Sequence, residues 1–222
     1  SEPEEYNNTM NYVITVEDIP QSVEYAERCI ESAAKHGMHV EKFSAITPRN
    51  TNLLDALVDE GLSVEGFREK YSRIENCVAA FLSHYSVWKL ATTSNMPTTI
   101  FEHDAVVTDR IDNVQFNKVI TVGKPSYGKY NTPMFLGTGP LTQKRYFGGA
   151  HAYRVNKQGA NALIGQARLY AQPTDVFLHL NNFPWLEESY PWKAEVKETF
   201  STIQNEQGCL AKHGYGEGYA LL

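Results

Sequence analysis

Hydrophobic and polar positions over residues 1–46 predict a strand, a helix and a second strand. Residues 11–16 (NYVITV) are apolar and rich in β-branched side chains, as in a buried strand. The next segment has apolar residues at helical spacing up to a stop at Gly37. These residues are Val23, Ala26, Ile30 and Ala33. Residues 38–46 alternate as a second strand would, and a β-α-β unit of this kind favours a parallel sheet.

Two longer helical patterns follow. Residues 74–93 carry an apolar stripe at helical spacing, which indicates one buried helix face. The stripe consists of Val78, Phe81, Leu82, Tyr85 and Trp88. Another helix is predicted to open near Asn156, after a glycine-containing turn and a strand. Its inner face consists of Ala160, Leu163, Ile164 and Ala167.

The remaining segments give shorter signals. Residues 118–122 (KVITV) predict a buried strand, whereas GTGPL at Gly137 predicts a turn. From Pro173 onward, prolines, aromatic residues and a glycine-rich tail at 214–218 predict loops. We expect a single domain over residues 10–222, preceded by a frayed or extraneous terminus at residues 1–9.

Composition narrows the class of protein. With 222 residues, 42% of them hydrophobic and 21% charged, the chain has the composition of a globular α/β domain. The apolar run 77–82 is far too short to span a membrane, and no signal-peptide pattern opens the chain, so we expect a cytoplasmic protein. A formal charge of -6 argues against a broad phosphate-binding surface, which leaves nucleic acid as a minority alternative. Cys29, Cys77 and Cys209 are too widely spaced for a CxxC metal site and are interpreted as reduced, mostly buried thiols.

The strongest candidate chemistry lies in residues 98–107 (TTIFEHDAVV), where an apolar strand runs into Glu102, His103 and Asp104. In an open α/β sheet, ligands bind outside the carboxyl ends of the strands. Two acids separated by one residue at such an end can both reach Mg²⁺ or Mn²⁺ bridging to a diphosphate. The alternative interpretation is a solvated acidic turn. His84 could be a catalytic base, although a structural histidine bonded between helix and sheet fits its position better.

Four stretches, read in order, resemble glycosyltransferase family 25, the lipopolysaccharide-type and procollagen galactosyltransferase-like group. Residues 12–46 resemble the opening strand, helix and second strand of that family, and ENCVAAFLSHYSVWKLA resembles its helix with SH-x-x-x-W. TTIFEHDAVV is similar to the family's ALILEDDAVV. FGGAHAYRVNKQGANALI followed by PTDVFLH resembles its G-T-x-AY block and P-V-D segment.

This resemblance implies a GT-A-like fold with a mostly parallel central sheet, flanking helices and a loop-rich acceptor side. It implies inverting transfer of a hexose from a nucleotide diphosphate sugar, most simply UDP-hexose, to a hydroxyl of a glycan, lipopolysaccharide or protein. Matched residue by residue, Glu102 and Asp104 are the metal ligands for Mn²⁺ or Mg²⁺, and Asp175 is the catalytic base. The donor-binding residues so implied are Thr15, Val16, Glu102, Gly148 and Gly149.

Two departures from the family pattern keep alternatives open. His103 stands where the family has a middle acid, and the opening loop reads TVEDIPQSVEYA where the family has an arginine-rich loop. A degenerate member that binds a sugar or glycan without turnover is one alternative, and a glycosyltransferase acting on hydroxylated DNA bases is another. For Asp175, a helix N-cap or first-turn acid remains an alternative to the base, because Pro-Thr-Asp also begins helices.

Overall fold

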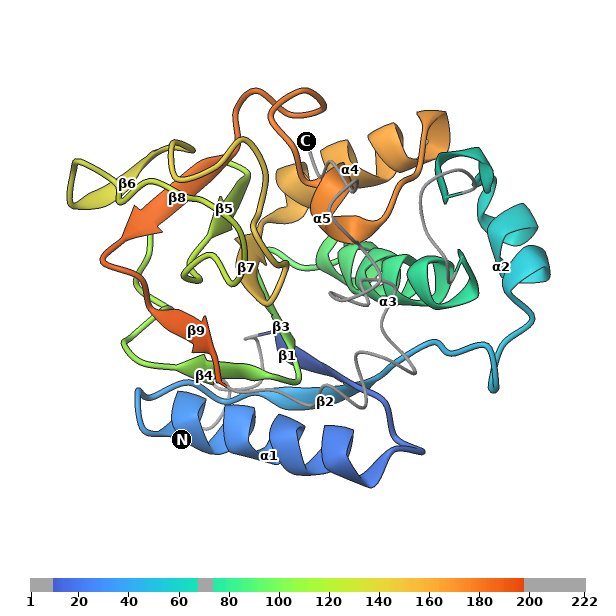
Figure 1. Cartoon of the computed structure of the whole chain (residues 1–222), viewed down its shortest axis with the longest axis horizontal. Coiled ribbons are helices and arrows are strands. Elements are labelled where there is room, and N and C mark those ends of the chain that lie inside the picture. The colour runs from blue at the N-terminus through green and yellow to red at the C-terminus, as the bar shows by residue number, and fades with distance from the viewer. Residues whose placement is uncertain (1–9, 68–73, 198–222) are drawn as a thin grey trace.

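The computed structural model describes residues 10–67 and 74–197 as an α/β protein (Figure 1). The strands are β1 (Met10–Thr15), β2 (Glu41–Ser44), β3 (Thr98–Glu102), β4 (Ala105–Val107), β5 (Val119–Thr121), β6 (Gly137–Pro140), β7 (Ala152–Val155), β8 (Glu187–Tyr190) and β9 (Ala194–Val196). The helices are α1 (Pro20–Ala34), α2 (Leu53–Glu60), α3 (Ile74–Ala91), α4 (Lys157–Leu169) and α5 (Thr174–Phe177), with a 3₁₀ turn, η2, at Glu65–Phe67. The terminus predicted at residues 1–9, the tail at 214–218 and Cys209 lie outside the described residues.

Seven strands form the central sheet in the order β2-β1-β3-β7-β5-β8-β6. β1 pairs in parallel with β2 and β3, and β5 pairs in parallel with β8. β7 is antiparallel to both of its neighbours, β3 and β5, and β6 is antiparallel to β8. Five of the seven strands therefore run in one direction, which confirms the expected α/β fold with a mostly parallel sheet.

Helices cover both faces of this sheet, as Figure 1 shows with α1 below it and α3 and α4 above it. Successive residues of a strand point to opposite faces, so Ile100 packs into the cluster around α3 while Phe101 packs into the cluster around α1. The α3 side holds the large aromatic side chains, including the fully buried Trp88. This two-sided burial explains why the strand sequences are nearly continuous in apolar residues.

The predicted helices begin and end close to where their sequence signals lie. Asn156 caps α4, since its side-chain oxygen accepts a hydrogen bond from the Gly159 backbone N–H at 2.8 Å. Gly159 packs so closely on the strand segment before β5 that an added Cβ would lie 2.1 Å from the Lys118 carbonyl oxygen. The prediction of a helix opening near Asn156 is thus confirmed, and α4 can approach the sheet because a glycine stands there.

Two sequence-based expectations about local structure are wrong. The segment at Gly137 forms β6 instead of a turn, and β8 and β9 form where loops were expected after Pro173. α5 agrees with the alternative that Pro-Thr-Asp begins a helix. β6 (GTGP) carries no apolar periodicity and is a strand because it pairs with β8. Gly137 itself has φ 89°, a left-handed conformation that glycine adopts without strain as the chain enters β6.

Candidate active site

The carboxyl ends of β1 and β3 bring most of the predicted site residues to one edge of the sheet. Thr15 is the last residue of β1 and Glu102 the last residue of β3, two neighbouring parallel strands. β7 runs the opposite way, so the residues just before it lie at the same edge. The Glu102 N–H donates to the His151 carbonyl oxygen there, at 3.0 Å.

His84 links the helix α3 to this edge. Its Nδ1 lies 2.7 Å from the Tyr153 hydroxyl on β7, and its Nε2 lies 3.8 Å from Glu102 Oε2. Trp88 Nε1 donates to the same Tyr153 oxygen at 2.8 Å. The hydroxyl proton of Tyr153 is then free to go to His84 Nδ1, which leaves the N–H of His84 on Nε2, facing Glu102. His84 therefore forms the expected helix-to-sheet hydrogen bond and, in addition, faces a carboxylate of the candidate site.

Replacing His84 with alanine is expected to lower the free energy of unfolding by about 2–4 kcal/mol before it affects chemistry. The side chain is 2% exposed, and its loss leaves a cavity and removes the partner of the buried Tyr153 hydroxyl. Denaturant unfolding of His84→Ala measures this, with the exposed His39→Ala as the control that should change little. A variant of unchanged stability that has lost all transfer would instead assign His84 to the chemistry.

The His103 side chain contacts the start of α1. Its Nδ1 lies 3.0 Å from Ser22 Oγ, and its ring stacks on Tyr25 with 6.4 Å between centroids. Ser22 Oγ also accepts the Val16 backbone N–H at 2.9 Å, so it donates its own proton to His103. The residue that departs from the family pattern thus supports the loop after β1, where Thr15 and Val16 lie.

Glu102 and Asp104 differ in their readiness to ionise. Desolvation opposes the charged form of Glu102, but His84, His151 and His103 together hold the pKa of this carboxyl below its ordinary value. Desolvation and the negative charge of Glu102 raise the pKa of Asp104. Glu102 therefore favours the ionised form more than Asp104 does, and its negative charge acts on Asp104 at the end of the same strand.

The carboxylates fit a metal ion that arrives with a substrate better than a resident one. Among residues 10–67 and 74–197, no group of three or more His, Cys, Asp or Glu side chains is arranged to hold a metal. Mg²⁺ and Mn²⁺, however, are commonly held by one or two carboxylates together with phosphate oxygens and water. Glu102 and Asp104 supply that number of ligands.

Gly148 and Gly149 form the turn that leads into β7. The Gly148 carbonyl oxygen accepts the Ser126 N–H at 2.9 Å, and Gly149 has φ 91°. An added Cβ at Gly149 would lie 2.4 Å from Ser126 Oγ and 3.0 Å from His151 Nδ1. The turn therefore needs glycine for both its conformation and its space, and it leaves backbone as the surface of the site here.

Asp175 is buried in the first turn of α5, with 3% of its surface exposed. The Tyr127 hydroxyl donates to Asp175 Oδ2 at 2.6 Å. Burial raises the pKa of Asp175 to about 6, against the hydrogen bond from Tyr127, and the charge of Glu102 raises it further. The N-cap position belongs to Pro173, so Asp175 is a first-turn acid and not the cap. The charge of Glu102 acts on its pKa, so the two carboxyl groups are coupled electrostatically.

Three residues near the site gave no signal in the sequence. Tyr127 reaches Asp175 from 48 positions away, and Lys144 lies over its ring with Nζ 4.9 Å from the centroid. Lys144 is a half-buried cation in contact with the tyrosine that bonds Asp175. Arg49, from the loop after β2, pairs with Asp18 in the loop after β1, with 2.9 Å between Nη2 and Oδ1. An arginine does reach the opening loop, but from a different part of the chain than in the family pattern.

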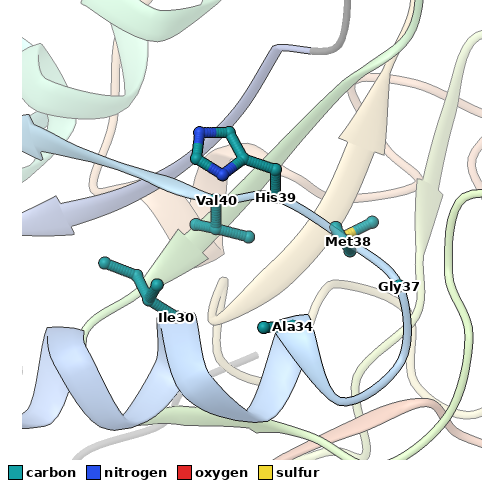
Figure 2. A pocket seen from close by; sticks show the side chains of 6 residues that line it. All are labelled: Ile30, Ala34, Gly37, Met38, His39 and Val40. Carbon is teal, nitrogen blue, oxygen red and sulfur yellow. The ribbon is translucent and has the colours of Figure 1, made fainter. Parts of the chain in front are cut away.

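A surface hollow of about 240 Å³ lies elsewhere, between the end of α1 and the segment that enters β2 (Figure 2). Ile30 and Ala34 line it from the helix, and Met38 and Val40 line it from the segment. Residues that precede β2 lie at the amino ends of the parallel strands, opposite the edge that carries Glu102. The hollow is therefore separate from the candidate active site.

The whole arrangement falls within a stretch that matches a known family. Residues 8–178 match the model of glycosyltransferase family 25, described as a lipopolysaccharide biosynthesis protein. The chain belongs to glycosyltransferase family 25. Among curated proteins, no sequence matches it.

Membership in family 25 makes the protein a glycosyltransferase, with a sugar donor and an acceptor. The match covers β1, β3 and α5, which carry Thr15, Glu102 and Asp175. It also covers Gly149, which precedes β7. The roles of the individual site residues of this family 25 protein remain predictions. In the described part of the chain, no helix is both long and apolar enough to cross a membrane.

Proposed function

We propose that this protein is a GT-A-type hexosyltransferase that moves a sugar from a nucleoside diphosphate donor to an acceptor hydroxyl with inversion. The observation that carries the proposal is the buried Asp175, with a pKa of about 6, beside the carboxylates at the end of β3. A carboxyl with this pKa is ionised near neutral pH and is more basic than an ordinary aspartate. It suits the removal of a proton from a hydroxyl as the glycosidic bond forms.

In this mechanism, Asp175 Oδ2 is held by Tyr127 and the carboxylate accepts the acceptor's proton. The acceptor oxygen attacks the anomeric carbon, and the bond to the diphosphate breaks on the opposite face of the sugar, which inverts the configuration. Positive charge develops on the sugar ring and negative charge on the departing phosphate. The burial of Asp175 limits the access of water to the carboxylate, so that water does not compete with the acceptor hydroxyl for it.

The leaving group needs compensating positive charge. Glu102 and Asp104 would hold Mn²⁺ or Mg²⁺, which neutralises a departing diphosphate when bound. Lys144 is a cation that the protein itself supplies, with Nζ 4.9 Å from the ring of Tyr127 and 4.8 Å from the ring of Tyr146. We expect it to face the donor phosphates.

The donor would lie along the edge formed by Thr15, Val16 and the Gly148–Gly149 turn. Thr15 is fully buried and supports the end of β1, whereas Val16 is half-buried and accessible to a nucleotide. The glycine turn allows a sugar to approach the backbone closely. UDP-hexose is the donor that we propose to test first, with a glycan, lipopolysaccharide or protein hydroxyl as acceptor.

A reducing compartment such as the cytoplasm fits the described thiols. Cys29 and Cys77 are free and buried, and burial raises the pKa of Cys29 to about 12. A thiol of that kind stays protonated and does not react with oxidants readily.

The proposal is tested by measuring hydrolysis of a panel of nucleotide sugars with Mn²⁺, with Mg²⁺ and with chelator. We expect one or a few donors to release nucleoside diphosphate in a metal-dependent manner, and the anomer formed with an accepted hydroxyl compound to be inverted. If the protein binds a donor but shows no turnover with any nucleotide sugar of the panel or any acceptor tested, it would be a family member that binds sugar without catalysis. Retention of configuration would exclude the single-displacement role of Asp175.

Removing the Tyr127 hydroxyl is expected to move the acid limb of the pH–rate profile upward by about one pH unit. The hydrogen bond from Tyr127 stabilises the ionised form of Asp175, so its loss in Tyr127→Phe raises a pKa that already lies near 6. The base is active when ionised, so kcat/KM should fall at a higher pH than in the unmodified protein. Tyr130→Phe, a neighbouring tyrosine that contacts Trp192, is the control and should leave the profile unchanged. A profile that Tyr127→Phe does not shift would contradict titration of Asp175 in the rate.

A further inference from the structure

An exposed apolar triplet stands at the edge of the molecule that carries the site. Met134, Phe135 and Leu136 are 88%, 82% and 79% exposed, and they directly precede β6. Single exposed apolar residues are ordinary on protein surfaces, but three in succession at this exposure mark an interaction site. We refer to these three residues as the apolar tip. Figure 1 shows the segment before β6 projecting from the molecule on the side away from α2 and α4.

The apolar tip lies in an excursion of the chain that begins shortly after Tyr127. Asn131 N–H donates to the Gln143 carbonyl oxygen at 2.9 Å, which closes the excursion at its base. Gly137 pairs with Tyr190 at the carboxyl end of β8, so the tip lies on the carboxyl-end side of the sheet. A surface bound by the tip would therefore face the same side of the sheet as the candidate active site, at the edge strand β6, with β7, β5 and β8 between it and β3.

The chain segment that contains the tip is basic. Residues 113–174 contain no Asp or Glu but eight Lys and Arg, although the chain as a whole has a formal charge of -6. At the base of the excursion, Lys129 is exposed, Lys124 Nζ lies 5.9 Å from the Trp192 ring, and Lys144 follows the Gln143 contact. We call Lys124, Lys129 and Lys144 the cationic base.

The acids nearest to the tip do not cancel this charge. Glu188 on β8 is 4% exposed, and its carboxylate accepts the Thr142 and Gln143 backbone N–H groups at 2.7 and 2.8 Å. Glu187 accepts the Asn117 N–H at 2.7 Å, on the side of β5. Both carboxylates are thus bonded within the fold, and Glu187 pairs with Pro140, at the end of β6 farthest from the tip.

We propose that the apolar tip and the cationic base form a docking surface for an anionic lipid bilayer. Apolar side chains that enter the headgroup region, together with lysines that meet anionic lipids, are the two terms that attach proteins to membrane surfaces. A second copy of the chain fits less well, because like charges would face each other and because Gly139 and Pro140 weaken β6 as a pairing edge. Nucleic acid would use the lysines but gains nothing from an exposed Met-Phe-Leu triplet.

The test is flotation of the full chain with vesicles of phosphatidylcholine alone or mixed with phosphatidylglycerol. We expect binding only to the mixed vesicles, weakened by salt. Replacing all three tip residues with serine should lower binding about tenfold or more, and Lys129→Glu should lower it at least about fivefold. The matched control is Leu54→Ser with Val58→Ser on α2, whose side chains are 67% and 76% exposed and which should bind normally.

A second measurement does not depend on loss of binding. Phe135→Trp places a reporter in the tip, and its fluorescence should shift to the blue and be quenched by brominated lipid in the anionic vesicles. Three results would overturn the proposal. The first is no binding to anionic vesicles, and the second is vesicle binding that the tip and lysine variants leave unchanged. The third is a protein that does not bind vesicles but forms a dimer, or a complex with duplex DNA, that the same variants abolish. Because the tip precedes β6, which three strands separate from β3, the tip variant should hydrolyse the donor normally, and this measurement separates the docking proposal from the proposed enzymatic function.

Discussion

Replacing Asp175 with asparagine is expected to lower turnover by roughly 10²- to 10⁴-fold while donor affinity is retained and the protein becomes more stable at pH 8. Turnover should fall because asparagine cannot accept the proton that the acceptor hydroxyl loses. Asparagine has the same shape and keeps an oxygen that can accept the hydrogen bond of the Tyr127 hydroxyl. Donor binding should survive because the asparagine keeps the shape of the side chain and its bond to Tyr127, so the substitution takes away only the basicity.

The gain in stability follows from the sign of the pKa shift. Burial raises the pKa of Asp175 from 3.8 to about 6, so the protonated form is favoured in the folded protein. The stabilising contribution of this carboxyl is complete at pH values below its pKa in the unfolded chain, 3.8, and is lost as the pH rises through the folded pKa of about 6. At pH 8 the buried carboxylate costs the fold up to about 3 kcal/mol, which Asp175→Asn removes.

Steady-state kinetics and denaturant unfolding at pH 5 and pH 8 measure both effects. The stabilisation should be present at pH 8 and small at pH 5, because the wild-type carboxyl is then largely protonated. Asp112→Asn, an exposed acid paired with Arg110, serves as the control and should change stability by no more than about 0.5 kcal/mol at either pH. Near-normal turnover of Asp175→Asn would leave this residue only its place in the first turn of α5.

Replacing Asp104 with asparagine is expected to abolish the metal-dependent part of donor binding and leave the fold intact. The side chain is half-buried at a strand end, and its pKa is already raised by desolvation and by Glu102, so removing the charge takes no stabilising interaction from the core. Loss of a residue that merely bonds a metal ligand lowers metal affinity by roughly 10- to 100-fold, so loss of a ligand itself should lower it by at least as much.

Calorimetric titration of nucleoside diphosphate, with Mn²⁺ and with chelator, measures this effect. The unmodified protein should bind more tightly with Mn²⁺, and Asp104→Asn should bind equally weakly under both conditions. Asp109→Asn is the matched control, because Asp109 lies on the same segment but is exposed and faces Lys193 at 3.4 Å. If Asp104→Asn binds donor and metal normally, the assignment of the metal ligands is wrong, although the membership in family 25 and the base role of Asp175 would stand.

The sequence by itself determined the elements whose burial is periodic. The stripe of residues 74–93 became α3, and the strand of residues 11–16 became β1, because an apolar side chain every three to four residues, or a continuous apolar run, is favourable only in one conformation. Asn156 set the start of α4 because a cap acts within three residues. The position of Glu102 at a strand end was also predictable, since it follows directly from where the apolar run stops.

Only the tertiary structure decided which side chains meet at the site. Tyr127 and Asp175 are 48 positions apart and His84 and Tyr153 are 69 apart, and neither pair has a local pattern that could reveal it. The strands β6 and β8 exist through their mutual pairing, since the glycines and proline of β6 have no strand preference of their own. The raised pKa of Asp175 likewise comes from burial by segments distant in the chain, because desolvation depends on everything packed around a carboxyl and not on its neighbours in sequence.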